Sequence, residues 1–340
     1  MPALSDVTQF LHGQLFETPP QPTTSFAGKT VVVTGANIGL GFESAKQLVN
    51  LDVAVLVLGC RDMGKAEAAR QALLDSSKNK KRTTKIHCWP VDMASYASVQ
   101  AFASRMARDL DRVDALVLNA GISTHEYTAA EGLESTLTIN VVSTFLLALL
   151  AMPQLQNTTA RFGAPTHLTV IGSMIHCFAD HTQLQNPREG ELFSTLSDKS
   201  QADMAGRYFL TKLMVLLVVR ELAERIPQSG KKGGARPQVI LTCPNPGWYK
   251  TALFRQDDGG VFARNILKLI GRTAEVGART LTHAIAADQA AHGQYLSECR
   301  VKSASVFVRS PEGQKVQKRV WTELVEMLES IAPGIQQNLS

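Results

Sequence analysis

Two residues that could move a proton, Tyr208 and Lys212, lie four positions apart in the segment Tyr-Phe-Leu-Thr-Lys. On a helix, such residues project from one face, one turn apart. A free tyrosine has a pKa of about 10, which makes it a poor acid or base at neutral pH. A lysine ammonium nearby favours the phenolate, so we expect Lys212 to lower the pKa of Tyr208. A phenol tuned in this way can exchange a proton with a carbonyl or alcohol oxygen, although the same spacing is common on surface helices.

A second group of residues could bind the phosphates of a dinucleotide. The stretch Thr-Gly-Ala-Asn-Ile-Gly-Leu-Gly, residues 34–41, follows the β-branched run 31–33 and precedes a helix-like segment, 42–49. Glycine lets the backbone turn sharply and approach a pyrophosphate, and the N-terminus of the next helix offers N–H donors. The spacing is GxxxGxG instead of the more familiar GxGxxG, and a purely structural turn is the alternative. The residues that we expect to contact the cofactor here are Gly35, Asn37, Ile38, Gly39 and Gly41.

The elements that must position these residues alternate along the chain. Apolar runs rich in Val, Ile and Leu predict strands, with helical segments between them. The predicted strands are residues 30–34, 53–58, 85–90, 114–118, 166–172 and 238–243, with a short one near 294–297. This alternation predicts an α/β fold with a doubly wound parallel sheet in a single domain.

Three segments fall outside this alternation. Residues 1–27 are predicted to form a loosely attached N-terminal arm before the domain of residues 28–340. Residues 174–205 and 252–272 are long, mostly polar or mixed connections. Long loops in a compact domain are usually functional, and ligands bind at the carboxyl ends of the strands, so we expect these two segments to be substrate lids.

The bulk properties exclude several classes of protein. The chain has 340 residues, of which 44% are apolar and 19% charged, as in soluble globular proteins. The net charge of +5 comes largely from two loop-like clusters, 78–82 and 231–236, without the interleaved aromatics of a nucleic-acid site. The apolar runs 145–152 and 213–219 are too short to span a membrane and the N-terminus lacks a secretion signal, so we expect a cytoplasmic protein. Five scattered cysteines predict reduced thiols and no metal site.

Four of these elements occur in the order and at the spacing of one known family. They are TGxxxGxG at residues 34–41, Asn119-Ala120-Gly121 after the fourth predicted strand, Ser173 after the fifth, and YxxxK at residues 208–212. Over roughly residues 28–300 the chain resembles the short-chain dehydrogenase/reductase family. The resemblance implies a Rossmann-like fold, a nicotinamide cofactor and a catalytic set of Asn, Ser, Tyr and Lys.

The resemblance implies a catalytic role for each of four residues. Ser173 would hydrogen-bond the substrate oxygen, and Tyr208 would exchange the proton with it. Lys212 would lower the pKa of Tyr208 and hold the nicotinamide ribose. Asn140 would steady a water on a proton path to Lys212. The alternatives are a strand-end cap for Ser173 and a buried, helix-bending amide for Asn140.

The family pattern also implies further contacts with the cofactor. Asn119 would pack under the cofactor and meet the adenosine ribose. Asp92 would contact the adenine ring, with a carboxylate at a helix N-terminus as the alternative. The segment 246–251 matches the family's PG…T segment, in which Thr251 would meet the nicotinamide carboxamide and Tyr249 would join the cofactor site.

The choice between the two nicotinamide cofactors can be argued from charge. A NAD site usually places a carboxylate at the end of the second strand, where it holds the ribose 2′-OH. Here Cys60 lies about where that carboxylate would be, and the guanidinium of Arg61 can bind a 2′-phosphate. Lys65 could help, whereas Asp62 beside Arg61 argues the other way. We therefore expect NADP(H).

The spacing from Ser173 to Tyr208 and the C-terminal tail suit the retinol-dehydrogenase-like branch of the family. The N-terminal arm is similar to that of soluble fungal reductases of secondary-metabolite pathways, and we expect no membrane anchor. The apolar helices around residues 145–152 and 209–222 pair subunits in this family, so a homodimer or homotetramer is expected, with ordinary core helices as the alternative. Apolar residues that could line the pocket are Phe178, Leu253, Phe254 and Phe262.

The resulting prediction is an NADP(H)-dependent oxidoreductase that interconverts an apolar ketone or aldehyde and its alcohol by hydride transfer. We expect a small apolar carbonyl or alcohol substrate and neither a nucleic acid nor a membrane as a partner. The alternative is a cofactor-bound protein without net redox chemistry, such as an isomerase, a cyclase or a cofactor-sensing module.

Overall fold

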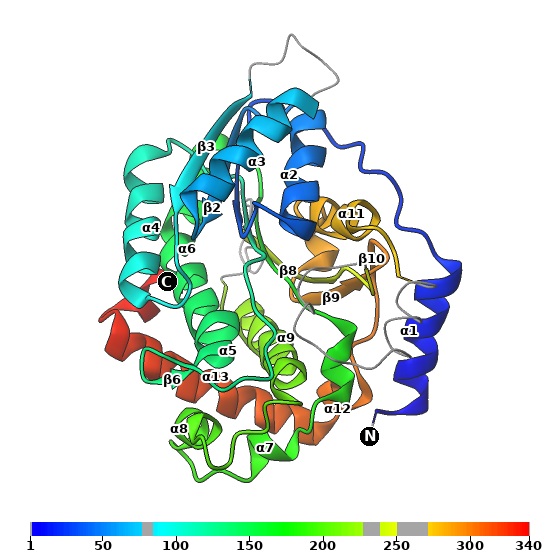
Figure 1. The fold of residues 1–340 in the computed structure, drawn as a ribbon, viewed down its shortest axis with the longest axis vertical. Coiled ribbons are helices and arrows are strands. Elements are labelled where there is room, and N and C mark those ends of the chain that lie inside the picture. Colours follow the sequence, from blue (N-terminus) through cyan, green and yellow to red (C-terminus); the bar gives the residue numbers. More distant parts are fainter. Residues whose placement is uncertain (1, 77–83, 227–238, 250–270, 340) are drawn as a thin grey trace, which may run out of the picture.

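A computed structural model describes residues 2–76, 84–226, 239–249 and 271–339 of the chain (Figure 1). Its centre is an eight-stranded sheet of order β10-β9-β8-β7-β4-β1-β2-β3, parallel except for the β9–β10 pair. The strands are β1 (Thr30–Thr34), β2 (Val55–Cys60), β3 (Lys85–Pro90), β4 (Ala115–Leu118), β7 (Thr166–Val170), β8 (Val239–Asn245), β9 (Gln294–Ser297) and β10 (Arg300–Val301). The predicted doubly wound parallel sheet is confirmed, with β10 as an additional edge strand.

Helices cover both faces of the sheet because its strands are apolar on both faces. In β1, Val31 and Val33 pack into one apolar cluster and Val32 into the other. The helices of the first cluster are α2 (Gly39–Asn50), α3 (Met63–Ser76) and α11 (Ala274–Ala284). Those of the second are α4 (Tyr96–Asp109), α6 (Ser143–Phe162), α9 (Arg207–Arg225) and α13 (Pro311–Ile331). The strand order reverses between β1 and β4, and ligands of such sheets bind at the carboxyl ends beside that point.

One continuous helical segment crosses the second cluster. It comprises α5 (Ser135–Leu137), the π-helical turn η1 (Thr138–Val142) and α6, which follows a short hairpin of β5 (Ala129–Ala130) and β6 (Leu133–Glu134). Among the described residues, this helix alone is long and apolar enough to cross a membrane, with a mean hydropathy of 1.8 in its most apolar window. That window is 94% buried inside the protein, as expected for a core helix.

The N-terminal arm is attached more firmly than the sequence indicated. Residues 4–16 form α1 (Leu4–Phe16), and Arg272 donates from Nη2 to the carbonyls of Gly13 (2.7 Å) and Glu17 (2.9 Å). Lys302 forms an ion pair with Glu17 at 2.8 Å. The prediction of loose attachment is wrong because residues from the C-terminal part of the chain, which no local pattern links to the arm, hold this helix.

The first predicted lid, residues 174–205, folds into three short helices: η2 (Met174–Phe178), α7 (Thr182–Gln185) and α8 (Leu192–Ser197). Arg319 of α13 donates to the carbonyls of Pro187 and Arg188, both at 2.7 Å. The carboxylate of Glu323 accepts from Leu192 N at 2.8 Å. This segment is therefore held against α13. Nearly all of the second predicted lid, residues 252–270, lies outside the described residues, together with Leu253, Phe254 and Phe262.

Candidate active site

The glycine turn between β1 and α2 has the geometry that its sequence requires. Gly35 and Gly39 have φ angles of +65° and +62°, a region that residues with a side chain rarely adopt. A Cβ added at Gly41 would lie 2.6 Å from the side-chain nitrogen of Asn119 and from the carbonyl oxygen of Gly35. The turn leads into the N-terminus of α2, so its backbone N–H groups and the helix dipole are suited to an anion.

Asn119 fixes this turn from the end of β4. Its Nδ2 donates to Thr34 O at 2.9 Å and to Gly35 O at 3.2 Å, while Thr34 Oγ1 accepts from the backbone of Asn119. Asn119 therefore shapes the predicted phosphate loop through its backbone.

The end of β2 carries a neutral thiol followed by a cation. Cys60 is buried, and burial raises the pKa of its thiol, so no negative charge lies at the position of the usual carboxylate. Arg61 is exposed at the rim of the cavity and makes no ion pair with any residue that the structure describes. Asp62 instead accepts from Lys65 N at 3.0 Å and pairs with Lys65 Nζ at 3.2 Å. The carboxylate of Asp62 is therefore paired with Lys65 and not with Arg61. The guanidinium of Arg61 is left as a cation at the rim of the cavity.

Asp92 lies at the same edge of the sheet, just after β3, and lines the cavity. Its Oδ1 accepts from Ala94 N at 3.0 Å, close to the start of α4. Asp92 thus has the contacts of the alternative, a carboxylate near a helix N-terminus, and its predicted contact with the adenine ring stays a prediction.

A single cavity of about 550 Å³ joins this region to the proposed catalytic residues. Gly35, Arg61, Ser173, Tyr208 and Lys212 all line it. The other predicted site residues along its wall are Asn37, Ile38, Gly39, Asp92, Asn119 and Tyr249. The fold thus brings together residues that are far apart in the sequence. Within 174–205, Ile175 alone lines this cavity, and Phe178 is 41% exposed beside Phe209.

Ser173 follows β7 and begins η2. Its Oγ accepts from Ile175 N at 3.3 Å, so it acts as the cap that the sequence left as an alternative. Ser173 also lines the cavity, as does Tyr208. A capping serine retains its O–H as a donor, and the two roles are compatible.

Tyr208 and Lys212 lie in the first turns of α9, with Lys212 Nζ 5.6 Å from the centroid of the tyrosine ring. Lys212 Nζ donates to Ile171 O at 2.7 Å. Burial raises the pKa of Tyr208 above its ordinary value, and the neighbouring Tyr249 adds to the rise. The expected lowering of this pKa by Lys212 is therefore wrong for this structure, because desolvation of the phenol is the largest influence on it. Burial also lowers the pKa of Lys212, to about 8.

Asn140 lies in the π-helical turn η1 and is 3% exposed. Its Oδ1 accepts from Ile122 N at 2.9 Å, and its Nδ2 donates to Ile122 O at 2.9 Å and to Thr211 Oγ1 at 3.2 Å. Such π-helical turns are frequent at functional sites. The Asn140 amide thus connects its own helix to Thr211 of α9, the residue before Lys212. These contacts fit the alternative prediction of a buried amide in a distorted helix. Its role toward a water stays a prediction.

Residues 246–249, which follow β8, line the same cavity as the glycine turn. Tyr249 lines the cavity and forms a parallel bridge with Arg272, while Thr251 lies outside the described residues. The backbone of Trp248 is bonded at both its N–H and its carbonyl to the side-chain amide of Gln14, each at 3.0 Å. Phe10 packs edge-on against the Trp248 ring, with centroids 5.1 Å apart. These two residues of α1 belong to the support of the site, and no pattern in the sequence connected them to it.

The described residues contain no cluster of His, Cys, Asp and Glu that could hold a metal ion, and their five cysteines are free thiols. The site therefore consists of a glycine-rich anion loop, a cation at its rim, the half-buried Ser173 and Tyr208, and the buried Lys212 and Asn140.

Comparisons with known proteins agree with this arrangement. The family model described as short chain dehydrogenase matches residues 29–164. Over 332 residues the chain is 40% identical to the short chain dehydrogenase/reductase dmxR8 of Cryptosporiopsis sp., which covers 97% of this chain and 99% of that protein. It is 38% identical to the short-chain dehydrogenase anuD of Penicillium roqueforti, over 96% of this chain and 84% of that one.

Solved structures share the fold at lower identity. The NADP complex of RhlG from Pseudomonas aeruginosa superposes with a TM-score of 0.57 at 20% identity, over 82% of this chain and 97% of that one. The NADH complex of 3-ketoacyl-(acyl-carrier-protein) reductase from Brucella melitensis gives 0.56 at 21%, over 80% and 97%. With the relatives of 38–40% identity spanning nearly the whole chain, the protein belongs to the short-chain dehydrogenase/reductase family.

Proposed function

We propose that this protein is an NADP(H)-dependent oxidoreductase that interconverts an apolar ketone or aldehyde and the corresponding alcohol. The observation that carries the proposal is the single cavity lined both by the glycine turn with Arg61 and by Ser173, Tyr208 and Lys212. The first set suits a dinucleotide, and the second suits a carbonyl oxygen that gains a proton.

The phosphorylated cofactor is favoured by the charges at the end of β2. Arg61 would face a ribose 2′-phosphate with its guanidinium, and the neutral Cys60 would not repel that group. The glycine turn and the start of α2 would hold the pyrophosphate, with Asp92 and Asn119 at the adenosine end. Lys212 and Tyr249 would lie at the nicotinamide end, and Thr251 is proposed to join them.

Ser173, Tyr208 and Lys212 are suited to proton transfer in the direction of reduction. When bound, the nicotinamide would supply the hydride to the carbonyl carbon. Tyr208, kept neutral by burial, would donate its phenolic proton to the carbonyl oxygen, while Ser173 would hydrogen-bond that oxygen. Lys212, with a pKa of about 8, can exchange a proton near neutral pH and so restore the phenol. Asn140 would hold the water that connects Lys212 to solvent.

We further propose a cellular role for the enzyme and consider its number of subunits. Relatives at 38–40% identity are fungal proteins, which supports a role in a fungal secondary-metabolite pathway; the cytoplasmic location is proposed from the sequence alone. Subunit pairing through α6 and α9 remains a prediction. The packing of α13 against α9 and of the C-terminal 3₁₀ helix η4 (Ile335–Leu339) against α6 favours the alternative of ordinary core helices. Light scattering on the purified protein measures the number of subunits.

The test is NADPH oxidation with acetophenone, phenanthrenequinone and aliphatic aldehydes, with NADH in parallel. We expect turnover with one NADPH consumed per alcohol formed and a preference for NADPH. Arg61→Ala should weaken NADPH binding about tenfold or more while leaving NADH binding nearly unchanged, because one charge-assisted contact is lost. Arg108→Ala is the matched control, since Arg108 is an exposed arginine that pairs with Asp109 and does not line the cavity. Equal losses for both cofactors would refute the role of Arg61, and product formed without NADPH consumption would favour the non-redox alternative.

A further inference from the structure

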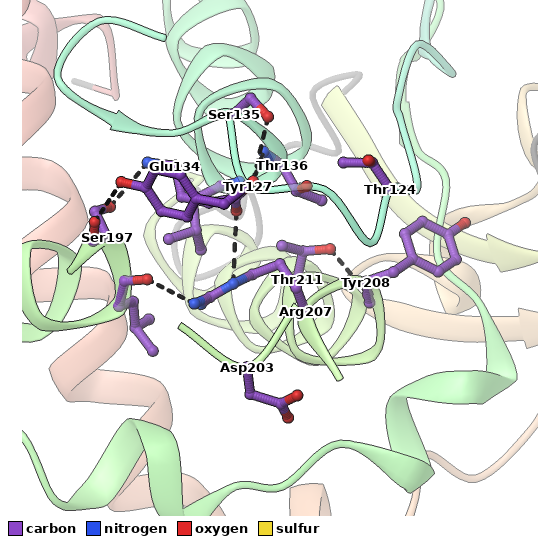
Figure 2. Close-up of polar contacts among 12 residues, drawn as sticks. Thr124, Tyr127, Glu134, Ser135, Thr136, Ser197, Asp203, Arg207, Tyr208 and Thr211 are labelled. Carbon is purple, nitrogen blue, oxygen red and sulfur yellow. Dashed lines mark hydrogen bonds and ion pairs between the residues drawn. The ribbon is translucent and has the colours of Figure 1, made fainter. Parts of the chain in front are cut away.

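Beside the catalytic group lies an ion pair that is almost completely removed from water. Glu134, at the end of β6, and Arg207, at the start of α9, have side chains exposed by 0% and 1%, and Arg207 Nε lies 3.5 Å from Glu134 Oε2. Figure 2 shows Arg207 and Tyr208 projecting to opposite sides from the beginning of α9, with the guanidinium directed toward Glu134 and Tyr127. Neither charged residue lines the cavity.

Each partner holds the beginning of one catalytic helix. The carboxylate of Glu134 accepts from Thr136 N at 2.7 Å and from Leu137 N at 3.2 Å, so it caps the helix that continues into η1 and carries Asn140. Arg207 immediately precedes Tyr208 in α9. The ion pair therefore joins the first turn of the helix of Asn140 to the first turn of the helix of Tyr208 and Lys212.

The same guanidinium reaches a third element. Arg207 Nη2 donates to Leu196 O in α8 at 2.6 Å. The neighbouring Ser197 accepts from Glu134 N through its Oγ (3.0 Å) and from Tyr127 Oη through its carbonyl (2.6 Å). These hydrogen bonds connect the ion pair to α8. Glu323 of α13 in turn holds α8.

Stability alone does not account for this arrangement. Arg207 Nε and Nη1 are buried without a hydrogen-bond partner among the described residues. Unsatisfied buried donors are unfavourable, and a buried ion pair is often no more stable than well-packed apolar residues in its place. The pair does connect two segments that are far apart in the sequence.

A second, neutral link joins the two helices on the side of the active site. Thr211 Oγ1 donates to Tyr208 O at 2.9 Å and accepts from Asn140 Nδ2 at 3.2 Å. This link lies one turn into α9, on the side of the cavity. The ion pair at the start of α9 is a second point of attachment, and two points define the orientation of a helix.

We propose that Glu134 and Arg207 are positioning residues that fix the helix of Tyr208 and Lys212 against the helix of Asn140. The pair touches neither substrate nor cofactor and acts through the placement of the phenol. This inference rests on the proposed function for its kinetic consequence, although the structural role can be measured without turnover.

The test compares two double variants. Glu134→Gln with Arg207→Met removes both charges together, so no unpaired charge is left buried, and the glutamine oxygen keeps an acceptor for one of the two N–H groups of α5. The control is Glu221→Gln with Arg225→Met, which removes an ion pair of 2.5 Å near the opposite end of the same helix. Arg207→Lys keeps the charge but cannot reach Glu134 and Leu196 O together.

Three measurements are made on each protein: amide hydrogen exchange, the Kd for NADPH by fluorescence, and kcat with acetophenone or phenanthrenequinone. For the Glu134/Arg207 variant we expect exchange about tenfold faster in residues 138–142 and 207–212, because both first turns loosen. Its kcat should fall about a hundredfold, as for a misplacement of about 1 Å, while the Kd for NADPH changes by less than about threefold. Arg207→Lys should lie between this variant and the wild type, and the control pair should leave kcat unchanged.

Wild-type exchange in both segments of the Glu134/Arg207 variant would overturn the positioning role, as would a fall in kcat no larger than that of the control pair. A wild-type protein without turnover on any carbonyl probe would instead overturn the proposed function. In that case the hydrogen-exchange result still decides whether the pair holds the two helices.

Discussion

The two ends of the cavity are built in different ways. At the cofactor end, the motif residues hold one another: Asn119 bonds the backbone of Thr34 and Gly35, and the glycines supply the φ angles of the turn. At the catalytic end, the motif residues are held by side chains outside every motif. Gln14 fixes Trp248 from 234 residues away, and Glu134 and Arg207 join the two catalytic helices. A motif can therefore identify a site whose supporting contacts it does not contain.

The largest effect is expected from Tyr208, the residue proposed to transfer the proton. Tyr208→Phe removes the phenolic hydroxyl and keeps the ring, so kcat should fall by about a hundredfold to ten-thousandfold. The Kd for NADPH should stay nearly constant, because the cofactor end keeps its contacts. Steady-state kinetics and fluorescence titration measure the two quantities. Retained turnover would contradict the mechanism.

The next effect concerns the charge buried at the catalytic end. Burial lowers the pKa of Lys212 to about 8, so between pH 8 and its ordinary value of 10.5 the unfolded state binds more protons than the folded state. Below pH 8, burial of the charged Lys212 ammonium lowers the free energy of unfolding by its full amount. This destabilisation disappears as the pH rises toward 10.5. The free energy of unfolding of the wild type, relative to Lys212→Met, should rise over this range by on the order of 3 kcal/mol. Urea denaturation at several pH values measures it, and a constant difference would show that Lys212 is not desolvated.

A comparable change at the cofactor end should act through sterics. In Gly41→Ala the new methyl group would lie 2.6 Å from Gly35 O and Asn119 Nδ2, so the turn must shift. We expect a loss of about 1–3 kcal/mol of stability and a weaker affinity for NADPH. Gly64→Ala is the control, because its nearest atom is 3.4 Å away. An unaltered NADPH affinity in Gly41→Ala would show that this turn does not shape the cofactor site.

The smallest effect is expected from Gln14 of α1, which supports the cavity wall at Trp248 and Tyr249. Gln14→Ala leaves the N–H of Trp248 without its side-chain partner, which costs about 1–3 kcal/mol when such a group remains buried, whereas the carbonyl keeps its bond from Arg272 N at 2.9 Å. The KM for NADPH should rise several-fold, since the wall containing Tyr249 loosens. Gln9→Ala removes a bond from the same helix to Ser303 and should leave the KM unchanged. If both variants behave alike, α1 contributes to stability only.

Much of the fold and of the candidate site could be predicted from local pattern. The strands were placed within a few residues because apolar β-branched runs mark them, although β2 ends at Cys60, two residues later than predicted. The glycine turn, Ser173, Tyr208 and Lys212 were found from residue type and spacing, and the cavity joins them. The direction of the Tyr208 pKa was missed, because spacing reveals a neighbouring charge and not the depth of burial.

By itself, the sequence determined the parallel sheet, the position of the anion loop and the identity of the residues that could move a proton, since each depends on backbone preference or on spacing within a few turns. Only the tertiary structure decided what holds them. Gln14 reaches Trp248, Arg207 reaches Glu134, and α13 fixes residues predicted to form a lid. These contacts join segments distant along the chain, and their partners are chosen by how the helices pack over the sheet, which no short stretch of sequence specifies.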